Sequence, residues 1–462
     1  MSRPPHSLSA RRLFGCGPGG APGSSREDAG RGARLARAGM WIVLLAMAAL
    51  TVAQTITWLP PNWPREDWPR KDLLSRYRDF VVFMGAMGQL EKTGVLYDTE
   101  SVNYFLPSSP AYKYPPTFAA VLRALHRLPL HRAMQIMVIA LASFLLASLV
   151  LALGMMRLRG ARALLVAILF LQWRAFWESM AGLQLETALL LLVWLGALLI
   201  VIRRASAAGF FVGIAAALKV YPLLLSLFFL PRRRGWGLAA VAAGGVFAAL
   251  ASCLALAPVY WAEYVTRILP RIGGTTLNPV NLSLHAFCAR AALLVSGGPE
   301  KLREAMLYVQ AESPAIAAAD LAGKLAFVLL ALLLAWFLAR AVRRAADMDP
   351  ARLDLLAYGL AVCFAVFVIP TSWPDYQLLL LVPLVIAIGC ARAPAEDRVV
   401  WGLIVLASAP GVLLDANSEP FGRHAIAASS ARALMPLLLG AALLALLRRT
   451  EARSVALPQP RS

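Results

Sequence analysis

Residues 203–234 read RRASAAGFFVGIAAALKVYPLLLSLFFLPRRR, an apolar segment with arginines at both ends and a break at Lys219. If this segment crossed a membrane once, one arginine cluster would lie outside, against the preference of arginine for the cytoplasmic side. Two short helices, Ser206–Leu218 and Tyr221–Leu230, that enter and return with Lys219 at the tip would keep both clusters inside. Broken helices at membrane depth are tolerated where they line a protein cavity. A straight single pass is the alternative.

The composition indicates a protein that is mostly embedded in a bilayer. Of 462 residues, 60% are hydrophobic and 15% are charged, whereas about a quarter of an ordinary soluble chain is charged. Many apolar runs reach about 18 residues, the length typical of membrane helices. Too little polar sequence separates them for a second soluble domain, so residues 40–449 form one predicted transmembrane domain.

The net charge of +20 comes mainly from arginines in short loops beside apolar runs, which is typical of topology signals. No basic surface is interleaved with exposed aromatic residues, so nucleic acid is excluded as a partner. The cysteines have no metal-ligand or redox spacing. They are Cys16, Cys253, Cys288, Cys363 and Cys390. We therefore predict no metal site and no cofactor.

The two ends of the chain are predicted to be cytoplasmic. Residues 1–39 are rich in Gly, Pro, Ser and Arg, which is typical of a disordered basic tail or of a start assigned too early. Residues 450–462 form a second tail. The first membrane helix is Met40–Trp58, and the first extracytoplasmic loop spans residues 59–132. The later apolar runs are Ala133–Met156, Ala161–Trp177, Leu183–Ile202, Trp236–Pro258, Ala315–Arg340, Leu353–Ile369, Tyr376–Cys390, Val399–Leu414 and Ile426–Leu447.

With the broken segment counted as two passes, the sequence predicts an all-α polytopic membrane protein with about 12 membrane segments, some of them short or re-entrant. All the arginine clusters then lie on the cytoplasmic side, which is the main support for this topology. The clusters begin at Arg157, Arg203, Arg232, Arg340 and Arg448.

Asp79 is the first candidate catalytic residue. Apolar residues recur after it with helical spacing, at Phe80, Phe83, Met84, Met87 and Leu90, which predicts an amphipathic helix lying in the membrane interface. A carboxylate near a helix start is favoured by the backbone N–H groups. It has two interpretations: a cap or ion pair, or a general base that removes a proton from an acceptor hydroxyl.

Four further candidates lie on the outer side of the predicted topology. Lys113 and Tyr114 precede a second interfacial helix, Thr117–His126; they serve either as a helix start with interface anchors or to bind a phosphate and a sugar. Gln184 and Glu186 begin a membrane helix. A carboxylate near membrane depth is usually functional or paired, and for Glu186 a pair with Arg174 is the alternative.

Lys219 and Tyr221 lie at the break in the apolar segment 203–234. A lysine in the middle of an apolar segment is costly, so it either extends to the interface or faces a functional cavity. At a re-entrant tip it would meet the phosphate of a lipid substrate.

The last candidates are Asn281 and His285, which open a helix, and Trp373 and Asp375, which lie at the outer ends of two helices. Asn281 is suited to a helix cap or to sugar hydroxyls. Trp373 fits an aromatic belt as well as a site. Asp375 is placed to face the same outer cavity as Asp79.

In this order and spacing, the motifs resemble glycosyltransferase family 87, polyprenyl-phosphate-sugar-dependent enzymes with the GT-C membrane fold. The resemblance spans nearly all of Met40–Leu447. Its motifs are Asp79-Phe80, Leu90 to Gly94, Leu96-Tyr97-Asp98, Tyr114-Pro115-Pro116, Gln184, Gly213 to Pro222, Asn281-x-Ser283-Leu284 and Ser372-Trp373. Two features depart from the family pattern: Pro374-Asp375-Tyr376 stands where many members carry a His pair, and Leu106–Ala111 is an insert.

The resemblance implies an α-mannosyltransferase-like hexosyltransferase. It would transfer a sugar, for which mannose is the leading candidate, from a polyprenyl-phosphate donor to a cell-envelope glycan or glycolipid. The configuration of the anomeric carbon would invert, and Asp79 would be the base. It implies a multi-pass protein of the inner (plasma) membrane, in contact with membrane lipid, with the active site on the extracytoplasmic face. The alternative is a flippase or transporter of a lipid-linked sugar, for which paired broken helices are typical.

Overall fold

In the computed structural model, the described residues are 38, 41–42, 44–53, 55, 63–67, 76–98, 112–232, 235–272, 281–288, 290–291, 294–295, 314–343, 349–369, 372–414 and 431–456. The predicted tail over residues 1–39 lies outside them, apart from residue 38. In the parts of the chain that are described, all regular structure is helical. An all-α fold is therefore confirmed.

The helices of the first half range in length from 9 residues in α7 to 27 residues in α5. They are α3 (Arg78–Thr93), α4 (Pro116–His126), α5 (Leu130–Met156), α6 (Gly160–Gln172), α7 (Arg174–Gly182), α8 (Glu186–Val201), α9 (Ala205–Leu218), η1 (Tyr221–Arg232) and α10 (Gly235–Ser252). The helices of the second half are α11 (Val259–Glu263), η2 (Tyr264–Ile268), α12 (Leu269–Ile272), α14 (Pro314–Arg343), α15 (Pro350–Val368), η4 (Pro374–Leu380), α16 (Leu381–Cys390), α17 (Arg398–Leu413) and α19 (Met435–Ala456).

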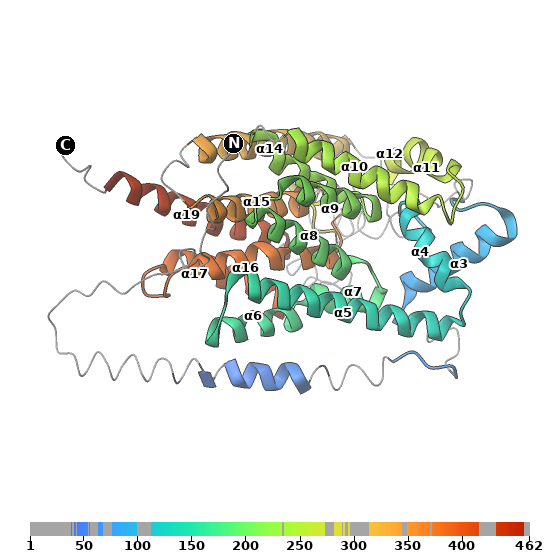
Figure 1. Ribbon diagram of the computed structural model, residues 1–462, viewed down its shortest axis with the longest axis horizontal. Coiled ribbons are helices and arrows are strands. Elements are labelled where there is room, and N and C mark those ends of the chain that lie inside the picture. Colours follow the sequence, from blue (N-terminus) through green and yellow to red (C-terminus); the bar gives the residue numbers. More distant parts are fainter. Residues whose placement is uncertain are drawn as a thin grey trace, which may run out of the picture.

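The long helices run side by side along the long axis of the molecule, and α3, α4, α11 and α12 gather at one end (Figure 1). We call this end the α3–α4 end. Helix α15 lies inside the bundle, since 94% of its most apolar 18-residue stretch is buried. Its start is capped by Asp349, whose Oδ1 accepts a hydrogen bond from the Ala351 backbone N–H at 3.1 Å, and Pro350 fits the first helical position.

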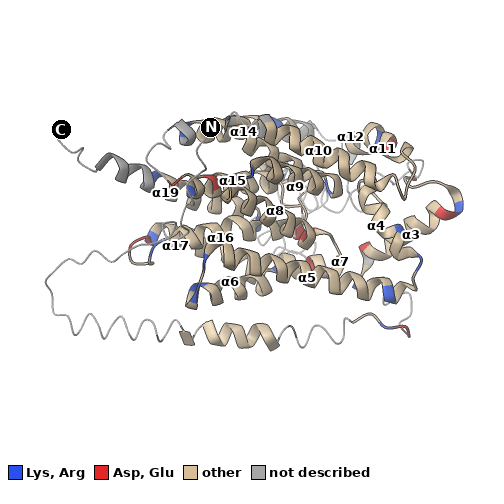
Figure 2. Cartoon of the chain, in the orientation of Figure 1, with Lys and Arg blue, Asp and Glu red and all other residues tan. Residues whose placement is uncertain are grey.

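Arginines bind backbone and carboxylate oxygens at the opposite end of the bundle, although Lys and Arg also lie at the α3–α4 end (Figure 2). Arg162 donates from Nη2 to the backbone oxygen of Arg392 at 2.9 Å, and Arg352 donates to that of Cys390 at 2.8 Å. The second bond satisfies a carbonyl that the end of α16 leaves unpaired. Arg203 pairs with Asp354 at 3.2 Å. We call this end the arginine end, because arginines of several predicted cytoplasmic loops meet there.

The apolar segment with a break at Lys219 forms a pair of helices. Helix α9 ends at Leu218, Lys219 follows, and η1 is a 3₁₀ helix. The two flanks of the pair lie together at the arginine end, since Arg203, Arg204 and Trp236 line one cavity of about 520 Å³. The chain therefore returns to the end from which it entered, as the prediction of two short helices requires.

Glycine makes this return compact. Helices α9 and α10 run parallel, and a Cβ at Gly213 would lie 2.1 Å from the backbone oxygen of Val241. A Cβ at Gly209 would lie 2.3 Å from that of Gly237. Only a residue without a side chain permits backbones to approach this closely.

By length and composition, four described helices are able to cross a membrane: Leu130–Met156, Gly160–Gly182, Pro350–Val368 and Ala431–Arg448. Seven shorter apolar helices accompany them: Leu44–Ala53, Glu186–Val201, Ala205–Leu218, Tyr221–Leu230, Trp236–Ser252, Pro374–Cys390 and Arg398–Leu413. The protein is therefore a polytopic membrane protein, and the number of about 12 segments stays a prediction.

The predicted amphipathic helix after Asp79 is present as α3. Its predicted apolar face is buried against the bundle, with Phe80 and Met87 at 0% exposed. The second predicted helix, Thr117–His126, is α4 and begins one residue earlier, at Pro116. The last helix, α19, continues to Ala456, into the segment that was predicted as the second tail.

Candidate active site

Asp79 lies in the first turn of α3 and is hydrogen-bonded to Gln184. The Nε2 of Gln184 donates to Oδ2 of Asp79 at 2.5 Å. Gln184 is itself held by α7, because its backbone N–H donates to the backbone oxygen of Ser179 at 2.9 Å. Gly182 makes room for the contact: a Cβ there would lie 3.1 Å from Asp79 Oδ2 and 2.9 Å from Gln184 Cγ. The candidate base Asp79 therefore accepts a hydrogen bond from the side-chain amide of Gln184.

Tyr114 orients that amide. Its hydroxyl donates to Oε1 of Gln184, and burial raises the pKa of Tyr114 well above its ordinary value, so the hydroxyl keeps its proton. Because the phenol donates, the amide oxygen of Gln184 must face Tyr114 and its NH₂ must face Asp79. Tyr97 fixes the loop, since its hydroxyl donates to the backbone oxygen of Tyr114 at 2.8 Å. Asp79, Gln184 and Tyr114 therefore form one directed chain.

Lys219 lies at the tip of the α9–η1 pair and is 5% exposed. Its Nζ contacts Oε1 of Glu186 and lies 3.6 Å from Oδ2 of Asp375. It also lies 3.9 Å from the ring centroid of Tyr376, on which Tyr221 stacks at 4.7 Å. We call these five residues the Lys219 group. The alternative pair of Glu186 with Arg174 does not form, because Arg174 lies beside Glu178 at 3.9 Å.

The Lys219 group joins the Asp79 chain through Tyr114. The Nζ of Lys219 lies 5.0 Å from the centroid of the Tyr114 ring, within the range of a cation–π contact. Tyr114 thus touches Lys219 with its ring and Gln184 with its hydroxyl. Residues predicted separately from five places in the sequence therefore meet in one group.

Three oxygens of the Lys219 group are buried without a hydrogen-bond partner among the described residues: Oε2 of Glu186, the hydroxyl of Tyr221 and Oδ2 of Asp375. Buried polar atoms in folded proteins are nearly always hydrogen-bonded. Their presence around one cation is typical of a site that receives a polar ligand or water.

Lys113 precedes Tyr114 in the same loop and is half-buried. Burial lowers the pKa of its ammonium group from 10.5 to about 8. The group therefore remains mostly charged at neutral pH and loses its proton above pH 8. Lys113 thus differs from Lys219, because it lies in the loop before α4 and not between two apolar helices.

Ser283 makes the helix cap, because its Oγ accepts from the Ala286 backbone N–H at 3.1 Å, and Asn281, which was considered for the cap, ties two segments together instead. Its Oδ1 accepts from the backbone N–H groups of Ser283 at 3.1 Å and of Ser372 at 2.9 Å. The second bond ties the turn that carries His285 to the segment before η4, in which Trp373 is partly exposed. His285 is buried at 5% exposed. Asn281 and Leu282, whose backbone N–H donates to the backbone oxygen of Ser372 at 2.7 Å, therefore lie beside the segment that leads to Asp375.

The model of glycosyltransferase family 87 matches residues 112–370, more than half of the chain. The chain belongs to glycosyltransferase family 87. The match includes Lys113, Gln184, Lys219 and His285, whereas Asp79 lies before it and Asp375 after it. Neither a curated protein nor a solved structure matches the chain.

This family 87 protein is accordingly a membrane glycosyltransferase, with a sugar donor and an acceptor as its substrates. In the described residues, no group of three or more His, Cys, Asp or Glu side chains is arranged to hold a metal ion. The cavity of about 520 Å³ lies at the arginine end. Its lining contains no carboxylate, whereas the candidate carboxylates Asp79, Glu186 and Asp375 lie in the two groups described above.

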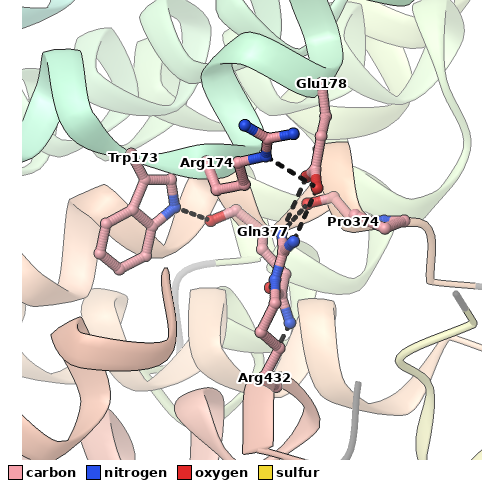
Figure 3. Close-up of polar contacts among 6 residues, drawn as sticks. All are labelled: Trp173, Arg174, Glu178, Pro374, Gln377 and Arg432. Atoms are coloured by element: carbon pink, nitrogen blue, oxygen red, sulfur yellow. Dashed lines mark hydrogen bonds and ion pairs between the residues drawn. The ribbon is translucent and has the colours of Figure 1, made fainter. Parts of the chain in front are cut away.

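A second buried ion pair of this glycosyltransferase was missed by the sequence analysis. Arg432 is 0% exposed and binds both carboxylate oxygens of Glu178, at 2.7 and 2.9 Å. Gln377 accepts from Nε of Arg432 at 2.9 Å, as Figure 3 shows. An arginine within an apolar helix is costly unless it is paired, so the position of Arg432 in the last apolar run was the signal that could have found it.

Proposed function

We propose that this glycosyltransferase transfers a sugar, with mannose as the first candidate, from a polyprenyl-phosphate donor to a cell-envelope glycan or glycolipid. The anomeric carbon inverts, and Asp79 acts as the general base. The observation that carries the proposal is the continuous chain from Asp79 through Gln184 and Tyr114 to Lys219. It joins a carboxylate to a buried polar group with unpaired oxygens.

The chemistry requires one base and one leaving group. Asp79 takes the proton of the acceptor hydroxyl while that oxygen forms a bond to the anomeric carbon. The bond between this carbon and the phosphate oxygen breaks, and its electron pair leaves with the polyprenyl phosphate. The amide of Gln184 holds the carboxylate of Asp79 in one orientation, which is the requirement for a positioned base.

The Lys219 group is suited to the hydroxyl groups of the sugar. Sugar hydroxyls donate hydrogen bonds, and carboxylate oxygens such as Oε2 of Glu186 and Oδ2 of Asp375 accept them. Tyr376, which is partly exposed, adds an aromatic face. The charge of Lys219 is balanced by Glu186, so in this proposal Lys219 holds the carboxylates in place and adds positive potential to the site.

Lys113 is the proposed partner of the donor phosphate. It lies next to Tyr114 in the loop before α4 and is less buried than Lys219. A cation beside the leaving phosphate stabilises the negative charge that develops in the transition state. Asn281, His285 and Trp373 complete the proposed substrate-binding residues along the edge that leads to Asp375.

The site lies at the end opposite to the arginine end. Because arginines prefer the cytoplasmic side, we propose that the α3–α4 end faces out of the cell across the inner (plasma) membrane. Cysteine labelling tests this orientation in a background without the native cysteines. A cysteine at the exposed position of Lys92 should react with an impermeant reagent in intact cells, whereas one at Arg204 should react only after lysis. The reverse pattern inverts the orientation.

The general base is tested with Asp79→Asn in membranes that contain a radiolabelled polyprenyl-phosphate sugar. Transfer should fall about 10²- to 10⁴-fold while donor binding is kept. Asp354→Asn removes a carboxylate at the arginine end and is the matched control. Transfer by Asp79→Asn at the wild-type rate would exclude the general base. Movement of labelled donor across the membrane without any transfer would favour a flippase instead.

A further inference from the structure

We propose that Arg432 is a positioning residue that sets the Asp79 half of the active site against the Lys219 half. The hydrogen bonds of its side chain go to Glu178, Gln377 and the backbone of Pro374, and not to Asp79 or Lys219. At one buried point it bonds to α7, which holds the backbone of Gln184, and to η4, which carries Asp375 (Figure 3). The inference rests on the proposed function, because it assigns Arg432 a role in that reaction.

One arm of Arg432 holds α7. The bidentate pair with Glu178 fixes this short helix four residues before its end at Gly182. Ser179, the next residue, accepts from the backbone N–H of Gln184 at 2.9 Å and donates from Oγ to its backbone oxygen at 3.3 Å. The position of Glu178 is therefore transmitted through one helical turn to the amide that binds Asp79.

The other arm holds η4. Arg432 donates from Nη2 to the backbone oxygen of Pro374 at 3.2 Å and from Nε to Oε1 of Gln377 at 2.9 Å. Gln377 returns a hydrogen bond from Nε2 to the backbone oxygen of Arg432 at 2.9 Å. These contacts lie on both sides of Asp375, which reaches Lys219. The position of this carboxylate therefore depends on Arg432.

Trp173 strengthens the same junction. Its indole N–H donates to the backbone oxygen of Gln377 at 3.0 Å, so the start of α7 is also bonded to η4. Only a planar guanidinium presents donors in the fork that a carboxylate and two further acceptors require at once. A lysine at this position would keep the charge and lose that geometry.

A shift of about 1 Å in a catalytic group can cost about 100-fold in rate without weakening substrate binding. We therefore expect Arg432→Lys to lower kcat by about 10- to 100-fold with little change in the donor KM. Rates are expressed per donor-binding molecule, so that a loss of folded protein does not enter kcat. A purely structural role would lower the number of binding molecules and leave kcat unchanged.

The paired variant Glu178→Met with Arg432→Met removes both charges, which spares the protein an unpaired buried ion. It should regain the yield and donor binding that either single substitution loses, while its kcat stays about 10- to 100-fold low. Arg352→Met removes an arginine that bonds the backbone oxygen of Cys390 at the arginine end and should keep the wild-type kcat. A paired variant with the wild-type kcat overturns the proposal.

The outcome for Arg432 is separable from the outcome for Asp79. Full activity of Asp79→Asn would exclude the general base, while the transfer rate of the Arg432 variants would still report on the junction. Conversely, wild-type kcat in Arg432→Lys would exclude the positioning role and leave the base untouched. Both sets are measured in the same membranes with the same labelled donor.

Discussion

Arg432 and Lys219 are both buried cations at the α3–α4 end, and each pairs with a glutamate, but their surroundings differ. All three guanidinium nitrogens of Arg432 donate hydrogen bonds, to Glu178, Gln377 and the backbone of Pro374. Around Lys219, by contrast, oxygens of Glu186, Asp375 and Tyr221 have no hydrogen-bond partner among the described residues. The first group is complete in the protein alone, and the second is not.

The difference shows how to separate architecture from a binding site in an apolar bundle. A buried pair whose hydrogen bonds are all made fixes the elements that carry it. A buried group that lacks partners has a cost that a bound polar ligand removes. On this basis the Lys219 group is where the sugar binds, and Arg432 holds the frame around it. Four substitutions or conditions would break or sharpen this distinction.

The largest effect on stability is expected for Arg432→Met alone. The substitution leaves the carboxylate of Glu178 buried and unpaired, which should cost about 3–5 kcal/mol. The free energy of unfolding in mixed detergent micelles measures it. Adding Glu178→Met should recover most of the loss. A loss below about 1 kcal/mol would mean that the pair is less desolvated than its 0% and 6% exposed side chains indicate.

The next effect concerns the link between the frame and the base. Gly182→Ala places a Cβ 3.1 Å from Oδ2 of Asp79 and 2.9 Å from Cγ of Gln184, so one of them must move. We expect kcat to fall about 10- to 100-fold, as measured with labelled donor. Gly154→Ala is the control, because a Cβ there meets nothing within 4 Å. Equal rates in the two variants would contradict the importance of the Asp79–Gln184 contact.

A pH series separates phosphate binding from sugar binding. Burial lowers the pKa of Lys113 to about 8, so its positive charge is present at pH 7 and is lost as the pH rises through 8. The donor KM should therefore rise about tenfold between pH 7 and pH 9. Lys113→Arg keeps its charge over this range and should give a flat profile. A wild-type KM that does not change would exclude Lys113 as the phosphate partner.

The smallest effect is expected for Tyr221→Phe. The lost hydroxyl has no partner among the described residues, so stability should not fall, whereas the loss of one hydrogen bond to the sugar should raise the donor KM about 2- to 12-fold. Tyr358→Phe removes a hydroxyl that donates to the backbone oxygen of Val193 at 3.2 Å and should leave KM unchanged. If Tyr221→Phe destabilises the protein and spares KM, its hydroxyl is structural.

Much of the fold was predictable because its signals are local. Apolar run length predicts membrane helices, and the spacing of Phe80, Phe83 and Met87 predicted the buried face of α3, as found. The return of the chain after Lys219 was predicted from the arginines at both flanks, and Arg203 and Arg204 do lie beside Trp236, which follows the second flank. The bend between α6 and α7 at Trp173 was not predicted, because no proline or glycine marks it.

The site was predictable residue by residue but not in its contacts. A lysine, a glutamate and an aspartate in apolar surroundings each stand out by their cost. That Glu186 pairs with Lys219 rather than with Arg174 depends on how α8 lies against the tip after α9. Asn281 was considered for a cap or for sugar binding, and its bond to Ser372 across 91 positions uses it as a tie between segments.

The sequence by itself determined the class of the protein, because bilayer thickness, helix periodicity and the side preference of arginine act on short stretches of chain. It also determined which residues are too costly to be incidental in an apolar bundle. The tertiary structure alone decided which of them share a point in space. It brought the amide of Gln184 into a hydrogen bond with Asp79. It also distinguished Arg432, whose three guanidinium nitrogens all donate hydrogen bonds, from the Lys219 group, in which three oxygens have no hydrogen-bond partner among the described residues. Hydrogen-bond satisfaction depends on packing between distant helices, which no local pattern encodes.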